Sequence, residues 1–170
     1  MSPIRFTIAS VVLSVLCVTG ASAAPAPKSK DAIAKLAAAA KPMSAEALDA
    51  IYSGKSWKWK DGGGYFASDK SFAGWQQTGP AWYYYGRGRW TTSNSGKLCM
   101  QALWYFRTGY DKNPSCILHR EKDGVIYQKP ALGGEWYVFR HNPTRPDDEI
   151  NRLKRGDRVS QHLSRLQAMR

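Results

Sequence analysis

The fold is decided by the stretch Lys55-Ser56-Trp57-Lys58-Trp59-Lys60-Asp61-Gly62-Gly63-Gly64-Tyr65-Phe66. Trp57 and Trp59 alternate with lysines, and this period of two predicts a strand because alternate strand residues face opposite sides. The run at 61–64 is typical of a turn, and an aromatic pair opens the next strand. The stretch therefore predicts a β-hairpin.

The same pattern of short alternating strands and Gly, Pro, Asn or Asp turns continues along the chain. Further strands are predicted at 65–67, 71–77, 81–85, 88–92, 97–106, 115–121, 125–128 and 135–141. One short amphipathic helix is predicted at 45–53, because Ser44 supplies an N-cap and Gly54 a stop. The expected fold class is all-β: a small antiparallel barrel of about eight strands, lipocalin-like or a sandwich, with a short N-terminal helix and a helical C-terminal tail.

The amino-terminal segment has the three-part order of a secretory signal peptide. Arg5 provides the positive charge, 13 residues from Phe6 to Val18 form the apolar run, and Ala21-Ser22-Ala23 offers a cleavage site. The apolar run is shorter than the roughly 20 residues that span a membrane. Residues 1–23 are therefore expected to be removed, which leaves no stable membrane span and a periplasmic or secreted protein.

Composition divides the remaining chain into three parts. Residues 24–43 are expected to be a flexible Ala/Pro/Lys leader that can form a short helix, residues 44–142 the β domain, and residues 143–170 a basic, partly helical tail. In this tail, Leu153, Val159, Leu163 and Leu166 are expected to line one face of a helix across an open end or edge of the sheet. The acidic run 147–149 is expected to be a solvated bend.

Cys99 and Cys116 are the only cysteines outside the signal segment, so export predicts a disulfide between them. The chain-entropy model gives a stabilisation of roughly 3 kcal/mol, and the Cα atoms should lie about 4.4–6.8 Å apart. A turn at 111–114 would not place the two cysteines opposite one another. We therefore expect a wide loop over 105–114.

A formal net charge of +12 favours anionic partners such as glycans, lipid head groups or nucleic acid. The most unusual segment for such contacts is 82–90, where consecutive aromatics must put rings on both faces of a strand. Rings beside guanidinium groups suit sugars and anionic groups. The candidate binding residues are Trp82, Tyr84, Arg87, Arg89 and Trp90, and the alternative is a girdle of large side chains that closes a small barrel.

Few residues suggest catalysis. His119 and Glu121 share a strand face and could form an acid–base pair, against the alternative of an ordinary cross-strand pair. No nucleophile motif accompanies them, so no enzymatic activity is expected. The spacing of His119, His141 and His162 suits no metal site, the glycine run lacks the Lys-Ser/Thr of a phosphate-binding loop, and no cofactor is expected.

Several residues occur in a pattern typical of a known family. They are the run 52–66, Gly88-Arg89-Trp90, Gly96-Lys97-Leu98-Cys99, Cys116, His119-Arg120, Ile126-Tyr127 and Glu135-Trp136-Tyr137-Val138-Phe139. The pattern resembles the domain-of-unknown-function family 995 of exported Gram-negative proteins. This resemblance implies an exported domain in which both cysteines belong to the shared pattern, and it implies no activity. A helix followed by Gly-x-x-Trp is also similar to the Gly-x-Trp opening of lipocalins, which favours a barrel over a sandwich.

Three functional hypotheses follow. The first is an exported, non-enzymatic binding module for an anionic or sugar-rich component of the cell envelope, such as a glycan or a lipid head group. The second is a protein-binding or inhibitor-type small barrel that uses the same loops. The third is an enzyme in which His119 and Glu121 act as acid and base.

Cleavage after Ala23 is the first testable prediction. Small residues at positions 21 and 23 follow an apolar segment too short to act as an anchor. Mass spectrometry of the exported protein should therefore find an amino terminus at Ala24-Pro25. A membrane-bound form that retains residues 1–23 would contradict the prediction.

Overall fold

A computed structural model of the chain describes residues 29–79, 82–112 and 114–169. The predicted signal peptide lies outside the described residues, as does the beginning of the leader. Within the described part, no helix is both long and apolar enough to cross a membrane.

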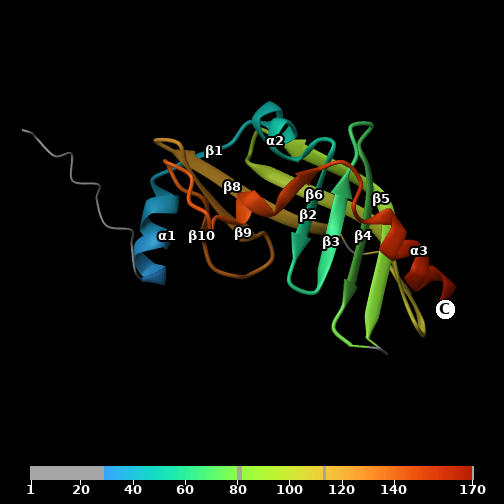
Figure 1. Cartoon of the computed structure of the whole chain (residues 1–170). Coiled ribbons are helices and arrows are strands. Elements are labelled where there is room, and N and C mark those ends of the chain that lie inside the picture. Colours follow the sequence, from blue (N-terminus) through green and yellow to red (C-terminus); the bar gives the residue numbers. More distant parts are fainter. Residues whose placement is uncertain (1–28, 80–81, 113, 170) are drawn as a thin grey trace, which may run out of the picture.

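The described residues form one antiparallel sheet that curls into a half-barrel, with three short helices around it (Figure 1). The strands are β1 (Lys41–Pro42), β2 (Lys55–Trp59), β3 (Gly62–Phe66), β4 (Ser71–Gln77), β5 (Tyr83–Ser93), β6 (Lys97–Phe106), β7 (Gly109–Asp111), β8 (Pro114–Lys122), β9 (Val125–Pro130), β10 (Tyr137–Arg140) and β11 (Leu153–Arg155). The helices are α1 (Lys30–Ala38), α2 (Ala45–Tyr52) and α3 (Ser160–Ala168), with a 3-10 turn η1 (Glu149–Arg152). The all-β, barrel-like prediction is confirmed.

Strand order across the sheet is β10-β9-β8-β6-β5-β4-β3-β2-β11, while β1 pairs with β8 and β7 with β6. Neighbouring strands from β2 to β6 are joined by successive hairpins, so the predicted succession of strands and turns determines most of this order. Figure 1 shows α1 and α3 at opposite ends of the curled sheet, with α2 between them.

Glycines that were predicted to lie in two turns are inside strands. Gly62, Gly63 and Gly64 belong to β3, and the hairpin turns at Lys60-Asp61 instead. Gly86 likewise lies inside β5, which is one continuous strand rather than two. Both errors have one cause, because glycine in a strand interior also marks a place where a ring or a backbone approaches closely.

Aromatic rings occupy the space that these glycines leave. Gly64, Gly74 and Gly86 stand side by side in β3, β4 and β5. A Cβ on Gly74 would lie 2.8 Å from the Phe72 ring, and one on Gly86 would lie 2.9 Å from the Trp104 ring. Rings that lie over strand glycines shield the bare backbone, so this row is part of the packing of the curled sheet.

The disulfide is present, and its register corrects the expected wide loop. Cys99 in β6 is paired directly with Cys116 in β8, with a Cα–Cα distance of 4.1 Å, just below the expected range. The chain turns tightly between Phe106 and Gly109, so β7 and β8 return along β6 in a single register. The turn therefore lies midway between the cysteines, and the predicted turn at 111–114 was wrong.

Alternation along the strands gives the sheet two buried faces. The inner face carries the main core, which includes Trp90 of β5, Phe72 of β4 and Tyr52 of α2. The outer face carries a second cluster, in which Tyr83 and Tyr85 of β5 pack under α3. The prediction that rings in the 82–90 segment face both sides is confirmed, and a different helix covers each face.

The carboxy-terminal segment differs in part from the expected helix. Leu153 lies in β11 and pairs with Trp57, and α3 begins only at Ser160. Leu163 and Leu166 are buried against the outer face of β4 and β5, so α3 covers a face rather than an edge. The residues between β11 and α3 are thereby held close to β2, where Ser56 Oγ donates to the Gly156 carbonyl at 2.8 Å.

Candidate functional site

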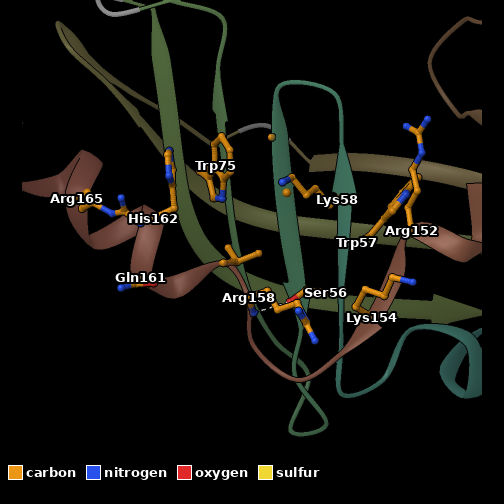
Figure 2. Close-up of a pocket in the computed structure, with 13 residues that line it drawn as sticks. Ser56, Trp57, Lys58, Trp75, Arg152, Lys154, Arg158, Gln161, His162 and Arg165 are labelled. Atoms are coloured by element: carbon orange, nitrogen blue, oxygen red, sulfur yellow. Dashed lines mark hydrogen bonds between the residues drawn. The ribbon is translucent and has the colours of Figure 1, made fainter.

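A pocket of about 370 Å³ opens on the outer face, between the sheet and the carboxy-terminal segment (Figure 2). We call it the basic pocket. Its lining residues are Ser56, Trp57, Lys58, Gly62, Gly63, Trp75, Arg152, Lys154, Arg158, Val159, Gln161, His162 and Arg165.

Strand register builds the floor of the basic pocket. Lys58, Gly63 and Trp75 are direct neighbours across β2, β3 and β4. A Cβ on Gly63 would lie 3.3 Å from the Trp57 carbonyl oxygen and 3.5 Å from Val159 Cγ2. Because Gly63 has no side chain, Val159, just before α3, can pack close to the floor of the pocket.

Cations from separate segments converge on the basic pocket, and none of its described lining residues carries a carboxylate. Lys58 comes from β2, Lys154 from β11, Arg158 from the connection to α3, and Arg165 from α3 itself. These four make no ion pair with any described residue, whereas Arg152 pairs with Glu149 at 3.2 Å. The arrangement can attract and hold an anion through charge-assisted hydrogen bonds.

Trp75 and His162 form an aromatic wall at one end of the basic pocket, as Figure 2 shows. Their ring centroids are 3.8 Å apart. The Trp75 indole N–H is buried and has no hydrogen-bond partner among the described residues. Burial, together with the charges of Arg165 and Lys58, lowers the pKa of His162 below its ordinary value.

The sequence-predicted binding residues do not form one surface. Along β5, Tyr84 faces the inner side of the sheet, while Arg87 and Arg89 face the outer side, because their positions differ in parity. Arg89 is hydrogen-bonded to the Asp69 carbonyl at 3.3 Å. The rings and guanidinium groups that are adjacent in sequence are therefore separated by the sheet itself.

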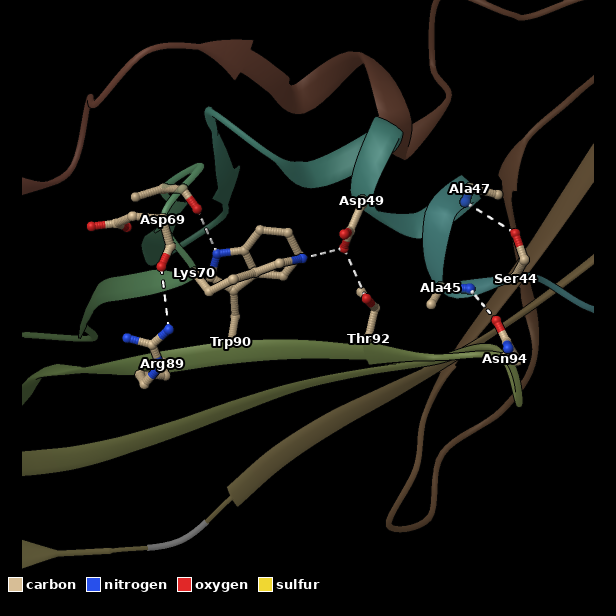
Figure 3. A network of polar contacts seen from close by, with 11 residues as sticks. Ser44, Ala45, Ala47, Asp49, Asp69, Lys70, Arg89, Trp90, Thr92 and Asn94 are labelled. Atoms are coloured by element: carbon tan, nitrogen blue, oxygen red, sulfur yellow. Dashed lines mark hydrogen bonds and ion pairs between the residues drawn. The ribbon is translucent and has the colours of Figure 1, made fainter.

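Trp90 belongs to the core, so its assignment as a binding residue was wrong. Its side chain is 0% exposed, and its indole N–H donates to the Ala67 carbonyl at 2.8 Å. Lys70 lies 3.8 Å above the ring and pairs with Asp49 of α2 (Figure 3). Asp49 also accepts a hydrogen bond from Thr92 at 2.8 Å. Trp90 is thus the point where α2 is fixed to β5.

Trp82 and Tyr84 remain accessible at one end of the sheet. They are 70% and 39% exposed, and with Phe106 and Arg107 they line a cleft of about 250 Å³. Tyr110 of β7, at the same end, is 66% exposed. This aromatic end is separate from the basic pocket, with which it shares no lining residue.

No hydrogen bond joins His119 to Glu121 among the described residues, and each side chain has other partners. His119 is 0% exposed, and Glu121 accepts a hydrogen bond from the backbone N–H of Gly124 at 2.6 Å. In this conformation the imidazole is sealed from any substrate by the core around it.

His119 instead belongs to a buried hydrogen-bond chain. The Tyr137 hydroxyl donates to Gln128 Oε1, Gln128 Nε2 donates to the Tyr52 hydroxyl at 2.7 Å, and that hydroxyl lies 2.7 Å from His119 Nε2. His119 Nδ1 lies 3.4 Å from the Gly96 carbonyl, which assigns its proton to Nδ1. Burial lowers the pKa of His119 to about 4, so the ring is neutral at pH 7.

Asp148 corrects the expectation of a solvated bend at 147–149. It is 4% exposed and accepts hydrogen bonds from His141 Nδ1 at 2.5 Å and from the Arg145 N–H at 2.9 Å. Burial raises the pKa of Asp148, but these hydrogen bonds outweigh burial and hold it below the ordinary value. The pair ties the end of β10 to the segment before η1.

No cluster of His, Cys, Asp or Glu among the described residues could hold a metal ion.

The basic pocket was missed by sequence reasoning because its residues come from two regions far apart in the chain, 56–75 and 152–165. Three signals were visible nonetheless. Lys58 alternates with the β2 tryptophans, and the tail is rich in arginine. The glycine run was the third signal, and its assignment to a turn concealed its position under the tail.

Comparison with known proteins identifies the family of this chain. Residues 14–159 match the family described as Protein of unknown function (DUF995). The chain belongs to this family. The resemblance seen in the sequence is therefore confirmed, and the DUF995 match covers both cysteines, the hairpins and most of the basic pocket. Searches of curated proteins and of solved structures found no match.

The buried histidine predicts acid sensitivity. The unfolded chain binds a proton near pH 6.5, whereas His119 in the folded chain binds one only near pH 4. The free energy of unfolding should therefore fall between pH 7 and pH 4, by about 3 kcal/mol from this residue. Urea titrations of the parent and of His119→Gln at several pH values measure the difference, because the variant keeps a polar side chain and loses the titrating group. Parallel pH profiles would contradict the assignment.

Proposed function

We propose that this protein is an exported, non-enzymatic binding module for an anionic or sugar-rich component of the bacterial cell envelope, with the basic pocket as its binding site. One observation carries the proposal: Lys58, Lys154, Arg158 and Arg165 gather at a single pocket without a carboxylate among its described lining residues. Clustered like charges repel one another, and a bound anion relieves that repulsion.

Location in the periplasm or outside the cell is part of the same proposal. The predicted signal peptide supports it, and so does the Cys99–Cys116 disulfide, because disulfides persist where thiols are oxidised. An exported basic domain meets the anionic polymers and head groups of the envelope directly. The charge of the chain would also draw such ligands toward the pocket over distances of about 10 Å at moderate ionic strength.

A protein partner is the second candidate, and it would use a different surface. Trp82 and Tyr110 are large aromatic side chains exposed at the same end of the sheet. Aromatic residues in such positions are enriched at protein interfaces. A partner bound there would leave the basic pocket open, so variants at Trp82 and Arg158 distinguish the two candidates.

Removing charge from the basic pocket should weaken binding and its salt dependence together. We expect the double variant Lys154→Ala, Arg158→Ala to bind heparin, used as a sulfated test glycan, and lipopolysaccharide less tightly than the parent. Its plot of log affinity against log salt should be shallower, by up to about one for each cation removed. Titration calorimetry of the mature chain at two salt concentrations measures both quantities.

The matched control is Lys97→Ala, Lys122→Ala, which removes two exposed cations from β6 and β8 outside the pocket. If the control weakens binding as much as the pocket variant, net charge alone holds the ligand and the site is wrong. If neither protein binds either ligand, the proposal fails.

Binding should also raise the pKa of His162. Burial and the neighbouring cations lower this pKa in the ligand-free protein, and an anion beside them removes the repulsion. Affinity should then increase as the pH falls toward 6, because the bound state takes up the proton more readily. Nuclear magnetic resonance titration of the His162 ring with and without ligand tests this shift, and the core residue His119 is the internal control. An unchanged His162 would place the ligand elsewhere.

A further inference from the structure

Two more hollows adjoin the basic pocket, one on each side. The edge hollow, about 370 Å³, is lined by Lys58, Trp59, Asn151, Arg152 and Lys154. The turn hollow, about 510 Å³, is lined by Lys60, Asp61, Trp75, Gln77, Gly79, His162 and Met169. We call the three together the basic groove.

Shared lining residues place the three hollows of the basic groove next to one another. Lys58, Arg152 and Lys154 line both the edge hollow and the basic pocket. Trp75 and His162 line both the basic pocket and the turn hollow. Each outer hollow therefore shares part of its wall with the basic pocket, and we treat the three as one groove.

The basic groove runs across the strands rather than along them. Lys154 of β11 is paired with Ser56 of β2. Two residues further along β2, Lys58 begins a row that continues through Gly63 of β3 to Trp75 of β4. Three inter-strand spacings of about 4.8 Å separate β11 from β4, so the groove crosses about 14 Å of sheet before the ends of the hollows are counted. A single phosphate or a single sugar would occupy only part of it.

Positive charge is spread along the whole groove. Exposed lysines and arginines line every hollow, from Lys154 at the edge through Arg158 in the centre to Lys60 at the turn. Asp61, in the turn hollow, is the one described acidic lining residue. Charges in succession match a ligand with repeated negative groups better than one compact anion, whose charge would reach only the nearest cations.

The aromatic residues of the groove distinguish between classes of polymer. Nucleobases bind to single-strand sites by stacking on open ring faces. Here one face of Trp75 is covered by His162 at 3.8 Å, and Trp57 is only 8% exposed. Trp59, in the edge hollow, is half-buried and packs against the core, with its ring edge-on to Trp57. The groove therefore presents many cations and hydrogen-bond donors but few open ring faces. Such a surface suits a sugar chain that carries acidic groups.

We infer that the basic groove binds several consecutive units of a linear polysaccharide that carries carboxylate, sulfate or phosphate groups. The inference rests on the proposed function and specifies its ligand as an extended chain. Binding of successive units follows from the groove's continuity, since each further charged unit would meet another cation at high effective concentration.

Chain length is the variable that tests the inference. Heparin oligosaccharides from disaccharide to dodecasaccharide are titrated into the mature chain by calorimetry at one salt concentration. Affinity should rise at least about tenfold between the disaccharide and the octasaccharide, and should level off once the groove is filled.

Two single variants separate the centre of the groove from its end. Arg158→Ala, in the central pocket, should weaken every oligosaccharide. Lys60→Ala, at the turn hollow, should weaken only the long ones, by roughly two- to fivefold. The control Lys122→Ala, an exposed lysine of β8 outside the groove, should change neither.

The outcomes separate this inference from the proposal beneath it. If the disaccharide binds in an Arg158-dependent way but longer oligosaccharides bind no more tightly, the proposed anion site stands and the extended groove is wrong. Absence of binding at every length would overturn both. Tighter binding of a single-stranded DNA of equal charge than of the dodecasaccharide would overturn the assignment to a polysaccharide.

Discussion

Alternation of side chains along β5 puts Trp90 on the inner face of the sheet and Tyr85 on the outer face, and each must be removed from water. Because both faces carry large rings, a single layer of strands cannot bury them, and a separate helix covers each side. Helix α2 covers the inner face through Tyr52 and the Asp49–Lys70 pair. Helix α3 covers the outer face, and its docking brings Arg158 and Arg165 beside β2 and β4. The basic pocket is thus a by-product of covering β5 on its second side.

Much of the fold could be predicted because its signals are local. The period of two gave β4 and β6 with their observed bounds, and the cap at Ser44 located α2. The errors occurred where a local signal has two physical meanings. Glycine ends a strand at some positions and makes room for a ring at others, and only the packing of Phe72 and Trp104 decides between them at Gly64 and Gly86. Tertiary contacts of that kind cannot be inferred from sequence spacing.

The site was less predictable than the fold. Sequence reasoning recognised that charge and aromatic rings were abundant, but it sought them in one segment, 82–90, where strand parity divides them between two faces. The pocket instead joins positions as distant as Lys58 and Arg165, which only the register of β2–β4 and the docking of α3 bring together. For His119, shared parity with Glu121 was a sound local inference. The burial that makes its ring a neutral member of a core network arises from Gln128, its partner in the next strand, and from Tyr52, which lies far away in the chain.

The exposed side chains of β11 have a consequence for solubility. β11 ends the strand order, and an end strand presents unpaired backbone groups that another chain can extend by strand addition. Lys154 and Arg155 make this border cationic, so two identical borders repel one another before their backbones can pair. Lys154, which lines the groove, therefore also acts with Arg155 as a gatekeeper against edge-to-edge aggregation.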